Sequence, residues 1–89
     1  MEIIRRASAG TMESSDAYVE IEPGTGGISL QLESVVQEQF GETISQTVRE
    51  LLTEMSVENA NIRVIDRGAL ERVIRARVET AVLRGKGNA

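Results

Sequence analysis

The chain has 89 residues, a formal charge of −4, 40% hydrophobic and 2% aromatic residues, and no Cys, His or Trp. A chain of this length buries only about 60 to 65% of the surface that it exposes when unfolded, which leaves little room for an enclosed catalytic cavity. Without Cys and His it lacks zinc-binding thiolates and imidazoles, a thiol nucleophile, a Ser-His-Asp triad and disulfides. The composition therefore predicts a single domain over residues 1–89 that is not an enzyme, has no catalytic residues and binds no metal.

No stretch approaches 18 consecutive apolar residues, and the first residues lack the apolar segment of a secretory signal, so we expect a cytoplasmic protein without a membrane segment. The charge is uneven, because residues 1–60 carry −8 and residues 61–89 carry +4. This distribution predicts an acidic face and a basic C-terminal helix. They are either two solvated surfaces or, for the acidic face, a docking site for basic partners.

Alternation of apolar and polar residues predicts two strands, Ala17–Glu22 and Ile28–Glu33. The segment between them, Pro23–Gly27, has the length and composition of a tight loop, so we expect the two strands to pair as a hairpin. A strand rather than a helix follows this Gly-rich loop, and the chain is acidic, so nucleic-acid binding is not predicted. Upstream, Ile3–Met12 is compatible with a third, irregular strand or a flexible arm, and we expect residues 1–8 to be flexible.

The first of two amphipathic helices is predicted to begin after Ser34, which can form a capping box with Gln37, and to end near Met55. A short strand, Ile62–Ile65, is expected to return beside the hairpin by a right-handed crossover. The apolar stripe of this helix consists of Val36, Phe40, Ile44, Val48, Leu51, Leu52 and Met55, and we expect Phe40 to lie in the core.

The second helix is predicted to be capped by Asp66 and to stop at Gly85, with an i, i+4 pair between Glu71 and Arg75 and with residues 86–89 flexible. Its apolar face consists of Leu70, Val73, Ile74, Val78, Ala81 and Val82. These elements predict an α+β fold, in which a small antiparallel or mixed sheet, made of the N-terminal hairpin and the later strand, is covered by two amphipathic helices.

The segment Gly10–Asp16 (GTMESSD) combines hydroxyl and carboxylate side chains just before the first predicted strand. Composition alone predicts a turn, in which Ser and Asp side chains bond to nearby backbone, and leaves a modification site as the alternative. No neighbouring group in the sequence can take a proton from a serine here. The small, polar residues 8–16 favour an exposed, mobile loop.

Further motifs follow this segment in a fixed order. Ala9–Asp16 is followed by Gln39-Phe40-Gly41, by Asp66–Leu70 (DRGAL) and by Arg75–Arg77 (RAR). Over Ala9 to Arg84 this order resembles the acyl carrier protein, or gamma chain, of citrate lyase. The pattern G-T-[LM]-E-S-[GS]-D is specific for that family among small acidic domains, although Met12 stands where Leu is more usual.

The resemblance implies a non-catalytic carrier in which Ser14, the first serine of the pattern, is linked by a phosphodiester to 2'-(5''-phosphoribosyl)-3'-dephospho-CoA. This phosphoribosyl-dephospho-CoA arm carries acetyl or citryl as a thioester, and the link makes the chain a phosphoprotein. Without the resemblance, Ser14 and Ser15 are not distinguished.

The same resemblance implies a cytoplasmic hetero-oligomer that includes the citrate lyase alpha chain, an acyl transferase, and beta chain, a citryl lyase. The alpha chain exchanges acetyl for citrate, and the beta chain cleaves the citryl thioester to oxaloacetate and regenerates the acetyl thioester. A separate prosthetic-group transferase attaches the arm.

Two alternatives stay open. One is the acyl carrier of malonate decarboxylase, which shares the arm but, in that family, lacks the D-x-G-A-L and R-A-R segments. The other is a small α+β adaptor without a prosthetic group that docks through its basic second helix.

Overall fold

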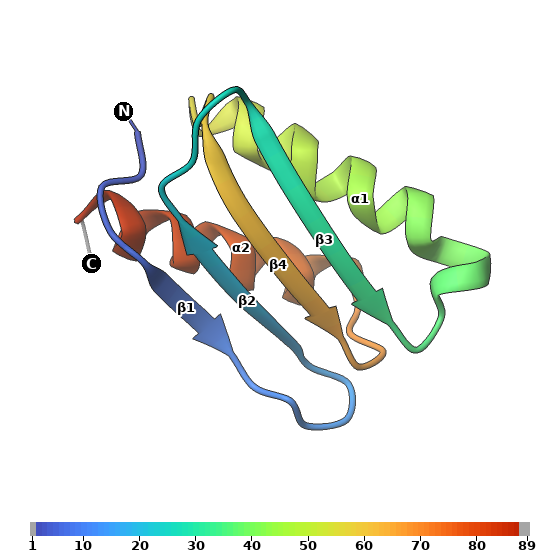
Figure 1. The fold of residues 1–89 in the computed structure, drawn as a ribbon. Coiled ribbons are helices and arrows are strands. Elements are labelled where there is room, and N and C mark those ends of the chain that lie inside the picture. The colour runs from blue at the N-terminus through green and yellow to red at the C-terminus, as the bar shows by residue number, and fades with distance from the viewer. Residues whose placement is uncertain (1, 88–89) are drawn as a thin grey trace.

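The computed structural model describes residues 2–87, in which four strands form one mixed sheet and two helices cover one of its faces (Figure 1). This architecture confirms the predicted α+β class. The elements are β1 (Ala7–Gly10), β2 (Ala17–Glu22), β3 (Ile28–Ser34), α1 (Gln37–Glu54), β4 (Ala60–Asp66) and α2 (Glu71–Lys86).

The order of the strands across the sheet is β1-β2-β4-β3. Strand β2 is antiparallel to both β1 and β4, whereas β3 is parallel to β4. The predicted hairpin of Ala17–Glu22 with Ile28–Glu33 is therefore wrong, because β4 lies between these strands. The true hairpin is β1–β2.

The segment Pro23–Gly27 passes over the end of β4 instead of forming a tight turn. The Ala60 N–H donates to the Gly27 carbonyl at 3.2 Å, and the Gly27 N–H donates to Asn59 Oδ1 at 2.8 Å. The inserted strand β4 alternates in burial and ends in three consecutive buried residues, Val64, Ile65 and Asp66. A strand with this much buried surface gains most from a central position, where it has neighbours on both edges, so burial favours the observed strand order.

Of the two interpretations of Ile3–Met12, a third strand or a flexible arm, the structure supports the strand. Strand β1 is shorter than that segment and covers only Ala7–Gly10. The residues before it, expected to be flexible, have specific contacts: Ile3 is buried, and the N–H groups of Ile4 and Arg5 donate to the Gly85 carbonyl at 2.9 and 3.2 Å. The prediction that α2 stops at Gly85 is wrong. Gly85 lies buried inside α2, where an added side chain would press on Ile3. The helix ends at Lys86, and Gly87 follows with φ +87°. The segment 86–89 was predicted to be flexible. Its first residue, Lys86, is the last residue of α2, and residues 88–89 lie outside the described residues.

Both predicted helix caps lie in turns that precede the helices. Ser34 ends β3, its N–H donates to Gln37 Oε1 at 3.2 Å and its hydroxyl accepts from the Val36 N–H at 3.1 Å. Asp66 ends β4, and its Oδ1 accepts from the Gly68 and Ala69 N–H groups at 3.2 and 2.8 Å. The Ser34 hydroxyl also donates to Asp66 Oδ2 at 2.7 Å, so the two turns are joined at one end of the sheet. The helices begin a few residues later, at Gln37 and Glu71, without side-chain caps.

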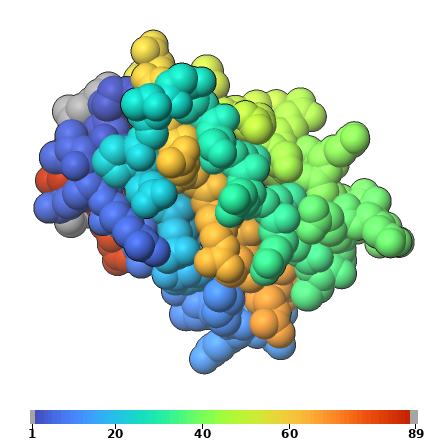
Figure 2. Space-filling model, viewed as in Figure 1, coloured from blue at the N-terminus to red at the C-terminus, as the bar shows by residue number. Residues whose placement is uncertain are grey.

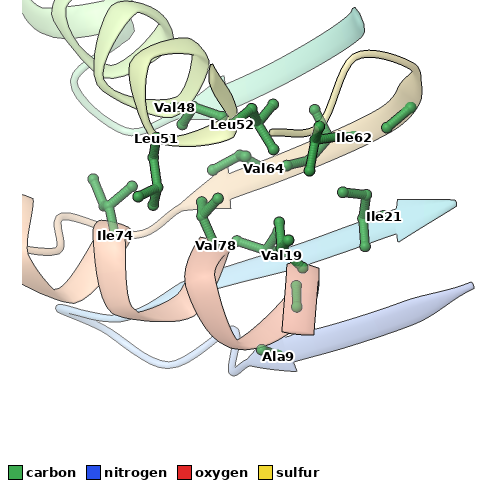
Figure 3. Close-up of a cluster of buried hydrophobic side chains, with 14 of the residues drawn as sticks. Ala9, Val19, Ile21, Val48, Leu51, Leu52, Ile62, Val64, Ile74 and Val78 are labelled. Atoms are coloured by element: carbon green, nitrogen blue, oxygen red, sulfur yellow. The ribbon is translucent and has the colours of Figure 1, made fainter. Parts of the chain in front are cut away.

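The core lies between the sheet and the helices (Figure 3). Strands β2 and β4 contribute Val19 and Val64, and the helices contribute Leu52 and Val78, each fully buried. Two predicted core residues are misplaced, because Phe40 is 52% exposed and Leu70 is 59% exposed. Both lie where a helix begins, and Figure 1 shows the first turn of α1 at the margin of the sheet, away from the strands that could cover it.

The predicted pair between Glu71 and Arg75 does not form in the structure. Arg75 pairs instead with Glu54 of α1, with 3.2 Å between nitrogen and oxygen, and Glu71 accepts from the Thr47 hydroxyl at 3.4 Å. Both charges therefore connect α2 to α1, because the helices pack side by side and bring these partners within reach.

Candidate functional site

The serine loop, residues 11–16, closes the β1–β2 hairpin and exposes Ser14. The Asp16 N–H donates to the Glu13 carbonyl at 3.2 Å, which closes a four-residue turn. Ser15, the third residue of the turn, has φ +66°, the left-handed conformation that a type II turn requires at this position. Gly adopts this conformation without strain, which accounts for Gly as the alternative to Ser at this position of the family pattern.

The Asp16 carboxylate anchors the loop to α2. Arg77 donates to it from two nitrogens, Nε to Oδ1 and Nη2 to Oδ2, at 2.9 Å each. The Thr11 hydroxyl donates to Oδ2 at 2.6 Å, and the Ala17 N–H donates to Oδ1 at 2.7 Å. These four donors, with Arg77 foremost, hold the pKa of Asp16 well below its ordinary value, and the same contact raises the pKa of Arg77.

A second anchor connects the loop to the turn after β4. The Ser15 N–H donates to the Arg67 carbonyl, and the Arg67 N–H donates to the Asp16 carbonyl, both at 2.9 Å. The serine loop is thus exposed, as predicted, but the expectation of a mobile loop is replaced by a loop tied at both residues that follow Ser14.

These anchors explain the distant motifs. The segment Asp66–Leu70 holds the loop through the backbone of Arg67, and the segment Arg75–Arg77 holds it through the Arg77 side chain. Both segments are visible in the sequence, but their contact with the loop is not. The signal that could have found the contact is the joint occurrence of an acid after the serine pair and an Arg pair separated by Ala on a distant helix.

The Ser14 hydroxyl is exposed, and within residues 2–87 the structure records no hydrogen bond to it. Of the two acids in the turn, Asp16 is occupied by four donors and has a lowered pKa, so it is a poor base for activating a serine. No cluster of carboxylates suited to a metal ion occurs in the described part of the chain. Among the described residues, the site therefore offers an exposed serine hydroxyl with no recorded hydrogen bond to a base.

A pocket of about 330 Å³ lies beside this end of the sheet, between the beginnings of α1 and α2. Its lining includes Val36, Phe40 and Leu70, and it adjoins the turn Asp66–Leu70 that anchors the serine loop. This surface is not apparent from the sequence, because the helical periodicity predicts Phe40 and Leu70 in the core.

No helix between residues 2 and 87 has the length and apolar character needed to cross a membrane. The family described as malonate decarboxylase delta subunit (MdcD) matches residues 4–85. In the solved structures, the chain is similar to one chain of a Pseudomonas malonate decarboxylase hetero-tetramer in complex with malonate, with a TM-score of 0.80 and 26% identity. That match covers 92% of this chain and 84% of the other.

Curated relatives are more similar in sequence. Citrate lyase acyl carrier protein 2 of Salmonella paratyphi A is 53% identical over 85 residues, which cover 94% of this chain and 88% of that protein. Citrate lyase acyl carrier protein of Lactococcus lactis subsp. lactis is 50% identical over 84 residues, with the same coverage. The protein of that name from Halothermothrix orenii is 45% identical over 89 residues, covering 100% of this chain and 95% of that protein.

Proposed function

Because the chain belongs to the family of citrate lyase acyl carrier proteins, as its motifs predicted, we propose that it is the gamma subunit of a citrate lyase complex, with Ser14 as the attachment site of its prosthetic arm. Members of this family are carriers and not catalysts. The observation that supports the assignment of Ser14 is its exposed, unbonded hydroxyl on a loop that Asp16 and Arg67 anchor. The cytoplasmic location stays a prediction.

The chain itself has no thiol, since it contains no Cys. Phosphoribosyl-dephospho-CoA would supply a thiol of pKa about 8 to 9, which can hold acetyl or citryl as a thioester. Ser14 would hold this arm through a phosphodiester, and an open hydroxyl at a hairpin tip fits such a bulky group. Because Asp16 is a poor base, a separate prosthetic-group transferase would take the proton from Ser14.

The anchored loop fits delivery to two enzyme subunits. Asp16 and Arg77 fix the origin of the arm, so that the arm and not the loop provides the reach between the alpha and beta chains. Tethering makes each encounter intramolecular and raises the effective concentration of the acyl group to about the millimolar range for a short flexible link. The proposed assembly is therefore a hetero-oligomer of carrier, alpha chain and beta chain.

The second candidate is the acyl carrier of malonate decarboxylase. It is favoured by the matching family description and by the fold shared with a malonate decarboxylase subunit at 26% identity. The curated relatives at 45 to 53% identity favour citrate lyase. Measuring which acid, citrate or malonate, the purified native complex consumes separates the two candidates.

The attachment site is tested by the intact mass of the protein from its native host. We expect a covalent adduct on the wild type and none on Ser14→Ala, with thermal stability changed by no more than about 1 kcal/mol because a surface hydroxyl contributes little. Ser15→Gly is the matched control, since it removes the neighbouring hydroxyl but keeps the turn conformation. A modified Ser14→Ala variant would contradict the site, and an unmodified wild type would support the adaptor alternative.

A further inference from the structure

The two edges of the sheet differ in how they are protected. At one edge, β1 has only four residues, and Arg84 donates to the Ser8 carbonyl at 2.7 Å. At the other edge, β3 has seven residues, alternating Ile28, Leu30 and Leu32 with polar residues, and contains no Pro or Lys. Proteins usually shield an open edge with short strands, charges or Pro, because free backbone groups recruit further strands.

The hydrogen bonds at both ends of β3 identify its free backbone groups. The Gly27 carbonyl and the Val35 N–H both bond to β4, at 3.2 Å each. Because backbone groups alternate in direction along a strand, the odd-numbered residues 29, 31 and 33 face β4. The N–H and C=O groups of Ile28, Leu30 and Leu32 therefore face outward, whereas the Ser34 N–H is already bonded to Gln37.

An open groove lies along the outer face of α1 and reaches the edge strand β3 at Leu32. Figure 2 shows side chains of α1 projecting beyond the edge strand. Its lining includes Leu32, Gly41 and Ser45, all small or apolar, and the acids Glu42, Glu50 and Glu54, which outnumber its one cation, Arg49. The groove thus combines a free strand edge with a surface that can hold the side chains of an added strand.

The charge of this surface indicates what it binds. Helix α1 carries four acids against one Arg, and only Glu54 of these acids has an ion-pair partner, Arg75, within residues 2–87. A second copy of the chain would bring two such acidic surfaces together, which costs free energy. A segment with Lys or Arg would instead find complementary charge.

We propose that the free edge of β3 binds an extended, basic segment of an enzyme subunit as a fifth strand, an inference that rests on the proposed function for the identity of the partner. The outward groups of Ile28, Leu30 and Leu32 bond to the backbone of the added strand, and Glu42 and Glu50 pair with its cations. The C-terminal end of β3 is joined to Asp66, next to the turn that anchors the serine loop. Docking at β3 therefore holds the partner near the end of the sheet from which the arm extends.

Amide hydrogen exchange of the ¹⁵N-labelled carrier, free and in complex with the subunits that co-purify with it from the native host, tests the proposal. The complex is exchanged, quenched and dissociated, and the amides are read by NMR. We expect the Ile28, Leu30 and Leu32 amides to exchange about tenfold or more slowly in the complex. The amides of residues 29, 31 and 33, already bonded to β4, should change little.

Charge reversal provides the matched variants. Glu42→Lys with Glu50→Lys should weaken assembly, whereas Glu79→Lys, on the exposed face of α2, should assemble normally. Assembly without alternate protection in β3 would overturn this inference alone. Protection of the same three amides in a homodimer, without any partner, would show that a second copy occupies the edge and would also overturn it. A carrier with which no subunit assembles would overturn the proposed function and this inference with it.

Discussion

Asp16 connects the serine loop to the second helix, and its ionisation determines how firmly the loop is held. Its folded pKa lies below its ordinary value of 3.8, so the ionised form stabilises the fold above about pH 3.8, and this contribution is lost as the pH falls below that value. We expect Asp16→Asn to lower the free energy of unfolding at pH 7, and the gap from wild type to shrink between pH 3.8 and pH 2. Urea denaturation at both ends of this range measures the gap. Glu13→Gln removes an acid of the same turn whose side chain has no recorded hydrogen bond or ion pair within residues 2–87, and it is the matched control.

Gly10 shows how one backbone position shapes the hairpin. Its φ is +94°, and an added Cβ would lie 1.9 Å from the Ala17 carbonyl oxygen. Gly26 also has a positive φ, of +76°, but has open space around its Cα. A left-handed conformation costs a residue with a side chain about 1 to 2 kcal/mol, so we expect Gly26→Ala to lose about that much and Gly10→Ala to lose clearly more. Equal losses in urea denaturation would contradict the close approach of the two strands.

At the scale of elements, only part of the apolar stripe that the periodicity of α1 predicted is buried. Ile44, Val48, Leu51 and Leu52 are buried, but Phe40 in the first turn is half exposed and lines the pocket near the serine loop. We therefore expect Phe40→Ala to cost about 1 kcal/mol or less, and Leu52→Ala to cost about 2 to 5 kcal/mol because it leaves a cavity in the core. Thermal unfolding of the two variants measures the difference. A loss of 3 kcal/mol or more for Phe40→Ala, about the usual cost for a buried Phe, would place this ring in the core after all.

At the scale of the whole molecule, the unit β3-α1-β4 inserts its last strand between β2 and β3. No strand pairing connects β2 to β3, so the two strands that are adjacent in sequence depend on β4 for their alignment. We expect a fragment of residues 1–34 to be unfolded by circular dichroism, although it holds three of the four strands, because an isolated β1–β2 hairpin is marginal in water. A folded sheet in this fragment would indicate the hairpin that the sequence suggested.

The sequence by itself determined the types of nearly all elements, the α+β class, the family, and Ser14 as the expected attachment site. These properties are local, because each strand or helix shows its buried face in its own periodicity and the serine lies in a short motif. The tertiary structure alone decided the strand order, the exposure of Phe40 and Leu70, and the contact between Asp16 and Arg77, 61 residues apart. These depend on which strands and helices compete for the same core, and a period within one element carries no information about that competition.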